Sequence, residues 1–382
     1  MKVSLFTGII FGDIIKAVYY TIFFTKLRNS TYNIKPYGHL LIEIVMKKNL
    51  KINLVFGASL LTLGSFLIIS PAKGSLPVSK TETQKIYKIF NLNTNKTSMQ
   101  VNNNLNQESG LFAAGSEPTL VAKQFKFTEG PATNKNGDVY FTDQPNDKIW
   151  KYSTDGKLSV FMEKSGRANG LYFDKKGNLI ACADEQNELW SISPQGKVTV
   201  LLKDYQGQKL NGPNDLWINP KTNIIYFTDP YYQRNYWERK SPEITGEKVY
   251  SFNPGKTAPQ VQDDNLKQPN GIIGTPDGKT LYVADIKDNK TYKYDIEANG
   301  KLSNRQLYVN QGSDGMTIDN KGNMYLTGKG VTVYNPAGEK IAQIPVPGNW
   351  TGNVTFCGKD HNILFITASE AVYTLPMLVK GV

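Results

Sequence analysis

Six polar residues recur along the C-terminal two thirds of the chain, each at the start of a short apolar run. Successive members are separated by 40, 45, 56, 44 and 39 residues. They comprise two carboxylates and four amides, and we call them the head residues: Glu129, Asn169, Asn214, Asn270, Asp314 and Asn353. Carboxylate and amide oxygens are hard ligands, which suit Ca²⁺, Mg²⁺ or Mn²⁺ better than softer or imidazole-preferring metals. Brought together, the six would form an oxygen-only site for a divalent cation.

The segments around the head residues indicate what positions them. Each head residue opens a repeat in which Gly-containing turns, such as KNGD and PDGK, separate β-type runs such as DVYFTD and LYVAD. This pattern is typical of hairpins. A period of roughly 40 to 50 residues with four strands per repeat is typical of propeller blades. The sequence therefore predicts an all-β fold over residues 119–382, a six-bladed β-propeller, and six heads in register favour it over a β-sandwich.

The last repeat contains only about three strands, so the ring needs one more. The run from Thr119 to Phe127, TLVAKQFKF, is expected to supply that strand and close the ring. Each head residue lies where the chain enters the innermost strand of its blade, so all six should meet at one mouth of the channel. Clustered carboxylates would repel one another without a cation. The alternative is that the heads only cap turns, because Asn-Gly and Asp-Gly are common turn formers.

The scarce residue types narrow the chemistry. The chain has two histidines, His39 in the predicted leader and His361 in a surface-type turn (KDHN), and these positions exclude a His-based zinc motif and a Ser-His-Asp triad. Cys182 and Cys357 lie in apolar, strand-like runs, where we expect free buried thiols. A disulfide between the two is the alternative in an oxidising compartment.

The net charge of +11 does not predict a nucleic-acid partner. Residues 1–74 contain nine Lys or Arg and two Asp or Glu, a net charge of +7, so only +4 belongs to the rest of the chain. A polyanion-binding surface would concentrate its basic residues on the folded domain.

The N-terminal third resembles a leader followed by a linker. Lys47, Lys48 and Lys51 precede an apolar stretch from Leu54 to Ile69, the pattern of a signal peptide over residues 46–74 with cleavage before Ser75. We therefore expect export to the periplasm or the medium, with membrane anchoring if the segment is not cleaved. Residues 1–45 are interpreted as an upstream extension, and the polar residues 75–118 as a disordered linker.

An unusually long loop in the third repeat could form a pocket wall. Residues 230–247 explain the 56-residue spacing and carry four aromatic side chains: Tyr231, Tyr232, Tyr236 and Trp237. Apolar walls around a few polar groups are typical of small-molecule sites. Packing between blades is the other interpretation of these aromatic residues.

Seven motifs, read together, resemble the SMP-30/gluconolactonase/LRE-like family over residues 120–375. In chain order they are EGPA, NGPNDL, FTDP, PNGI, TPDGK, LYVAD and SDGM. The resemblance implies a six-bladed propeller that holds one divalent cation, usually calcium, and hydrolyses sugar lactones or related esters. Magnesium, manganese or zinc are the other candidate cations, with zinc disfavoured by the oxygen ligands. The resemblance also implies metal ligands at Glu129, Asn214, Asn270 and Asp314.

The catalytic hypothesis builds on that ligand set. Asp314 is our choice for the general base, with Glu129 as the second candidate. Asn169, Asn211, Tyr231 and Tyr232 are the predicted contacts of a small sugar lactone. Some animal members of the family carry a substrate-binding arginine two positions before the first ligand asparagine, where this chain has Gly212. The alternatives are a phosphotriesterase and a secreted, non-catalytic propeller that binds a glycan or a protein.

Overall fold

The computed structural model describes residues 31–37, 39–46, 50–56, 65–71, 106, 109–256 and 258–382. The chain divides into two units, residues 1–100 and 101–382. The first contains one antiparallel sheet of four strands: β1 (Thr31–Tyr37), β2 (His39–Met46), β3 (Leu50–Phe56) and β4 (Ser65–Pro71). Within the described residues, no helix has the length and apolar character needed to cross a bilayer.

The predicted leader and linker lie largely outside the described residues. Within the predicted signal segment, residues 46–74, the structure describes only the end of β2, β3 and β4, so export stays a prediction. Most of the predicted linker, residues 75–118, is likewise undescribed. Near its end, however, Leu111 and Phe112 are buried against the last blade.

The second unit consists of six four-stranded antiparallel sheets, numbered here as blades 1 to 6. Blades 1 and 2 contain β6 (Thr128–Thr133), β7 (Val139–Asp143), β8 (Lys148–Tyr152) and β9 (Leu158–Glu163), then β10 (Ala168–Phe173), β11 (Leu179–Ala183), β12 (Glu188–Ile192) and β13 (Val198–Leu202). The short 3-10 helix η1 (Gln144–Asn146) joins β7 to β8. Blades 3 and 4 contain β14 (Leu216–Ile218), β15 (Ile225–Asp229), β16 (Lys248–Phe252) and β17 (Gln260–Asp263), then β18 (Pro269–Gly274), β19 (Thr280–Asp285), β20 (Lys290–Ile296) and β21 (Leu302–Val309).

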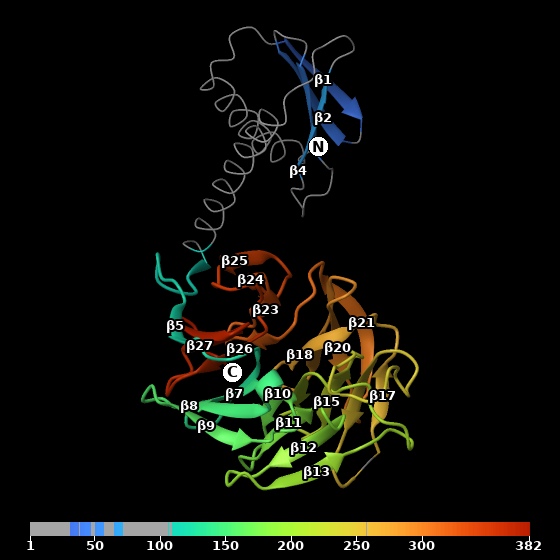
Figure 1. The fold of residues 1–382 in the computed structure, drawn as a ribbon, viewed down its shortest axis with the longest axis vertical. Coiled ribbons are helices and arrows are strands. Elements are labelled where there is room, and N and C mark those ends of the chain that lie inside the picture. The colour runs from blue at the N-terminus through green and yellow to red at the C-terminus, as the bar shows by residue number, and fades with distance from the viewer. Residues whose placement is uncertain are drawn as a thin grey trace. The chain divides into compact units, whose positions relative to one another are not determined.

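Blades 5 and 6 complete the ring. They contain β22 (Met316–Ile318), β23 (Met324–Gly328), β24 (Gly330–Tyr334) and β25 (Lys340–Ile344), then β26 (Asn353–Cys357), β27 (Ile363–Ala368), β28 (Ala371–Pro376) and β5 (Thr119–Ala122). The first strand of each blade contacts that of the next, and β26 contacts β6. Strand β5 pairs with β28, with Leu120 opposite Tyr373, as Figure 1 shows for the teal strand beside the red blade. The predicted six-bladed propeller and its closing strand are confirmed.

Apolar side chains fill the space between each pair of neighbouring blades. The described part of the chain contains six buried clusters, one for each interface around the ring. The period of two along a strand sends adjacent residues to different interfaces. On β15, Tyr226 packs between blades 3 and 4, whereas Phe227 packs between blades 2 and 3. Cys182 and Cys357 lie in separate clusters as free, buried thiols, which confirms that prediction.

Close contacts between blades hold the inner ring together. In four blades the residue after the head residue is glycine: Gly130, Gly170, Gly271 and Gly315. A Cβ atom at each of these positions would come closer than 3.0 Å to a head residue, or its successor, in the next blade. Threonine hydroxyls also donate to carbonyl oxygens of the next blade, as Thr228 does to Asn270 O at 2.8 Å. The heads therefore lie where adjacent blades touch.

Adding a methyl group at one of these contacts is expected to weaken the ring. Gly271→Ala would force a Cβ against the backbone oxygen of Asp314. We expect a loss of about 3 kcal/mol in the free energy of unfolding, because overpacking at a backbone contact finds little room to relax. The matched control is Gly196→Ala, at a φ of +80° with no atom within 4 Å, where only backbone strain of about 1 kcal/mol applies. Urea unfolding measures both, and an equal or smaller loss for Gly271→Ala would contradict this account.

Candidate metal centre at the channel mouth

The ring brings the head residues together at one end of the channel. Each lies at or just before the first residues of the inner strand of its blade. Glu129, Asn214 and Asn270 are 3%, 5% and 3% exposed, whereas Asp314 is partly exposed. Asp314 also accepts a 2.6 Å hydrogen bond from Nε1 of Trp350. The four side chains predicted as metal ligands thus come from four different blades.

A third carboxylate, Asp215, joins the two among the heads. It is 7% exposed and accepts hydrogen bonds from the backbone N–H of Leu216 at 3.0 Å and from Nδ2 of Asn353 at 3.3 Å. Burial raises the pKa of Asp215 to about 7, and the charge of Asp314 contributes to the increase. We did not predict Asp215 as a site residue. The available signal was that it occupies the position after a head residue, where four other blades have glycine.

Burial disfavours the ionised forms of all three carboxyl groups, and neighbouring carboxylates add to this effect at Glu129 and Asp215. Burial, and then the charges of Asp314 and Asp215, raise the pKa of Glu129 well above its ordinary value. Burial likewise raises the pKa of Asp314 to about 6, although hydrogen bonds from Trp350 and Asn270 and the charge of Arg234 act in the opposite direction. A divalent cation among these groups would remove the repulsion and favour all three carboxylates.

The amide side chains also fit such an ion. Asn214 and Asn270 are 5% and 3% exposed and lie in the ring of heads. Amide oxygens are hard, neutral ligands, so both side chains suit coordination of a divalent cation alongside the carboxylates. Among the described residues, no three His, Cys, Asp or Glu side chains form a metal-binding group by themselves. A cation at this position would therefore need amide oxygens as well as carboxylates as ligands.

The predicted substrate contacts have different environments. Asn169 is 7% exposed and lies in the ring of heads. Tyr232 contacts the ring, because its hydroxyl accepts a 3.1 Å hydrogen bond from Nδ2 of Asn270. Tyr231 instead packs against Trp237 within the loop and donates its hydroxyl hydrogen to Gln233 at 2.6 Å. Asn211 is 1% exposed, and its Nδ2 donates to the backbone oxygens of Asp229 and Gly246.

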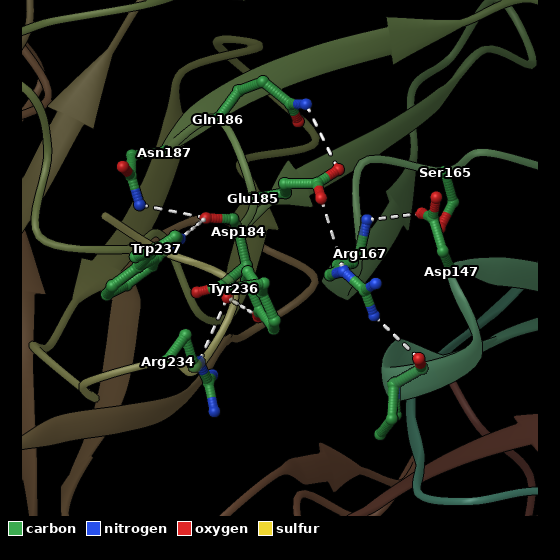
Figure 2. A network of polar contacts seen from close by, with 11 residues as sticks. Asp147, Ser165, Arg167, Asp184, Glu185, Gln186, Asn187, Arg234, Tyr236 and Trp237 are labelled. Atoms are coloured by element: carbon green, nitrogen blue, oxygen red, sulfur yellow. Dashed lines mark hydrogen bonds and ion pairs between the residues drawn. The ribbon is translucent and has the colours of Figure 1, made fainter. Parts of the chain in front are cut away.

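The long loop, residues 230–247, connects β15 to β16 and reaches blade 2 as well as the ring. Its Trp237 is buried and donates from Nε1 to the backbone oxygen of Asp184 at 3.0 Å (Figure 2). A side chain at Gly212 would meet this arrangement, because its Cβ would lie 2.9 Å from Oδ1 of Asp184 and 3.0 Å from Trp237. The glycine at position 212 is therefore a packing requirement of the loop.

A cavity of about 290 Å³ follows the inner strands from the ring towards the opposite end of the channel. Asp215 and Asn353 contribute to its wall, which includes the apolar side chains of Trp217 and Phe356. Asp215 thus borders a cavity whose wall is both polar and apolar.

Comparison with known proteins identifies relatives of this chain. A gluconolactonase of Zymomonas mobilis is 29% identical over 284 residues, covering 66% of this chain and 79% of the relative. Diisopropyl-fluorophosphatase of Loligo vulgaris is 26% identical over 288 residues, covering 66% and 88% of the two chains. The solved structure of a Xanthomonas campestris gluconolactonase superimposes with a TM-score of 0.66 and 25% identity, over 70% of this chain and 92% of that one.

The family model matches most of the propeller. It is described as the SMP-30/gluconolactonase/LRE-like region, and it matches residues 127–370, which include all six head residues. On the strength of that match, this chain belongs to the SMP-30/gluconolactonase/LRE-like family.

Proposed function

We propose that this protein is a divalent-cation-dependent hydrolase that opens the ring of a sugar lactone. The observation that carries the proposal is the oxygen-only ring of Glu129, Asn214, Asn270 and Asp314, set in a propeller whose relatives include gluconolactonases. Calcium is the cation we expect, because the ligands are hard oxygens from separate blades; magnesium, manganese and zinc are the alternatives.

The bound cation would supply Lewis-acid polarisation of the ester carbonyl. The chain's own groups supply orientation and proton transfer. Asp314 is the general base in this proposal: Trp350 holds its Oδ2, which fixes the orientation of the carboxylate for accepting a proton from the attacking water. Glu129 is the second candidate for that role. Asn169 and Tyr232 are positioned to contact the substrate at the ring.

Phosphotriester hydrolysis is a second candidate activity. It is supported by the similarity to the Loligo enzyme, which extends over 88% of that protein. A cation-centred site that polarises a C=O bond could also polarise a P=O bond. A non-catalytic, secreted binding propeller is the third possibility.

We also propose that the protein is exported. The support is the signal pattern of residues 46–74 in the sequence. The N-terminus of the mature protein, determined by sequencing, is expected to be Ser75. A mature chain that retains residues 1–45 would contradict both the predicted signal and the interpretation of these residues as an upstream extension.

A parallel assay tests the proposed activity directly. Purified protein with calcium is expected to open D-glucono-δ-lactone, to lose that activity in excess EGTA and to regain it with added calcium. If the protein hydrolyses an organophosphate triester but no lactone, the result would favour the second candidate activity. Metal-dependent melting without hydrolysis of either ester would favour the binding propeller.

The Asp314→Asn variant tests the assigned base. The amide keeps an oxygen available for the cation but cannot accept the proton, so turnover is expected to fall by about 10² to 10⁴-fold. Circular dichroism and calcium-dependent melting serve as the control for folding and metal binding. A folded, calcium-binding variant with wild-type turnover would show that Asp314 is not the base.

Metal-free protein is expected to lose stability as the pH rises. The folded-state pKa values of Asp314 and Asp215 are raised to about 6 and about 7, so the folded state binds protons more tightly than the unfolded one. Their contribution to the free energy of unfolding is complete below about pH 4, the pKa of these groups in the unfolded chain. It is lost as the pH rises to about 7. Thermal melting between pH 4 and 8 should show this decline in EGTA. Calcium should reverse it most strongly at high pH, because protons compete with the cation for the carboxylates.

A further inference from the structure

Aspartates at the end of the second strand perform the same structural task in three blades. Their carboxylates accept backbone N–H groups from the segment that leads into the head residue. The pairs are Asp143 with Lys126 and Phe127, Asp229 with Asn211 and Gly212, and Asp285 with Lys267 and Gln268. This repeated contact fixes the approach of the chain to the ring.

The aspartate of blade 2 departs from that pattern. The side-chain carboxylate of Asp184 accepts no backbone N–H among the described residues. Its Oδ2 instead accepts hydrogen bonds from Nε of Arg234, at 3.0 Å, and from the hydroxyl of Tyr236 (Figure 2). The segment leading into this blade is held by Asp147, whose Oδ1 accepts the N–H of Arg167 at 2.7 Å. Asp184 is therefore free to hold an arginine of the long loop.

Arg234 lies close to the candidate metal centre. Its guanidinium stacks on the ring of Tyr232, 5.4 Å from the ring centroid, and the Tyr232 hydroxyl contacts Asn270. Its positive charge opposes the increase in the pKa of Asp314. The contact through Asp184 uses only Nε, and within the described part of the chain neither terminal nitrogen has a hydrogen-bond partner. Figure 2 shows the terminal nitrogens pointing away from Asp184.

The contacts that anchor Arg234 preorganise its two terminal guanidinium nitrogens for binding a ligand. The Asp184 side chain is 2% exposed and that of Arg234 is 22% exposed, so the ion pair is largely shielded from water. Stacking on Tyr232 and the bond at Nε together restrict the plane of the guanidinium. A planar group held in this way presents its remaining N–H donors in a fixed fork and loses little entropy when it binds oxygen atoms.

The charge balance favours a neutral ligand for this fork. Asp184 compensates the charge of Arg234, and the ring adds three carboxyl groups at Glu129, Asp215 and Asp314. A single divalent cation would not give the mouth an excess of positive charge. An anionic substituent would therefore gain little electrostatic energy here, whereas the hydroxyl oxygens of a neutral sugar can accept the N–H groups.

We propose that Arg234 determines specificity by donating hydrogen bonds to hydroxyl oxygens of the lactone ring, so that the site prefers polyhydroxylated lactones to unsubstituted ones. This inference rests on the proposed lactonase function and identifies the residue that recognises the hydroxyl groups of the sugar. Arg234 is a substrate-binding residue in this scheme, and Asp184 is a positioning residue that acts through it.

The test compares two lactones on matched variants. For Arg234→Gln, kcat/KM on D-glucono-δ-lactone is expected to fall at least about tenfold, mainly through KM, because hydrogen bonds from a charged donor are lost. The loss on δ-valerolactone, which has no hydroxyl groups, is expected to be about twofold or less. Arg167→Gln is the matched control at the same mouth, since Arg167 donates to Pro145 and Glu185 within the protein. It should leave the preference between the two lactones unchanged.

Asp184→Asn separates positioning from direct binding. It keeps Arg234 but removes the ionic anchor, so KM for gluconolactone should rise by less than in Arg234→Gln. Melting temperatures of the variants show whether each is folded. Equal losses on both lactones for folded Arg234→Gln, or no loss on either, would overturn the inference.

Failure of the proposed function would be visible separately. A wild-type protein that opens neither lactone would overturn that function, while the inference would still be decided by titration calorimetry with D-glucitol, a neutral polyol that presents sugar hydroxyl groups without a carboxylate. Weaker D-glucitol binding by Arg234→Gln than by the wild type and Arg167→Gln supports the role of Arg234. Equal binding by the three proteins overturns it.

Discussion

The close approach of neighbouring inner strands is the constraint on which the rest of this structure depends. At Gly130, Gly170 and Gly271 the next blade occupies the space that a Cβ atom would need. The head residue of one blade is therefore positioned by direct contact with the blade before it. Because the contacts continue around the ring and β5 closes it, the six heads share one mouth. The geometry of the candidate site is a property of the closed ring and of no single blade.

The convergence of the head residues lowers the stability of the fold when no cation is bound. Glu129, Asp215 and Asp314 are held near one another in a poorly hydrated place, which raises the pKa of each carboxyl group. Burying carboxylates without a counter-charge opposes folding. Such a cluster is a common feature of binding sites, where stability is given up for a preorganised charge distribution. A divalent cation would convert the unfavourable repulsion into favourable coordination.

Several residues on which the proposals rest lie where blades 2 and 3 depart from the repeat. Asp215 carries a carboxyl group at a position where four blades have glycine. The long loop of blade 3 extends to blade 2, where Asp184 binds Arg234 instead of the backbone groups that its counterparts bind. The regular contacts of the other blades provide a rigid frame, so these irregular residues can project polar groups over the mouth without loosening it.

The repeat spacing, the hairpin turns and the alternation of apolar residues were sufficient to predict the propeller, its closing strand and the convergence of Glu129 and Asp314. Each blade depends on contacts between residues near in sequence, which the local pattern records, and the repetition of six such units implies both the ring closure and the convergence of their first strands. The local pattern did not predict the roles of Asp215 and Arg234 or the hydrogen-bond partners of Asn211. Arg234 and Asp184 are 50 residues apart, and Asp215 meets Asn353 across 138 residues. Only the closed ring brings such side chains within hydrogen-bonding distance, because their separation is set by the angles between blades and by the path of one long loop.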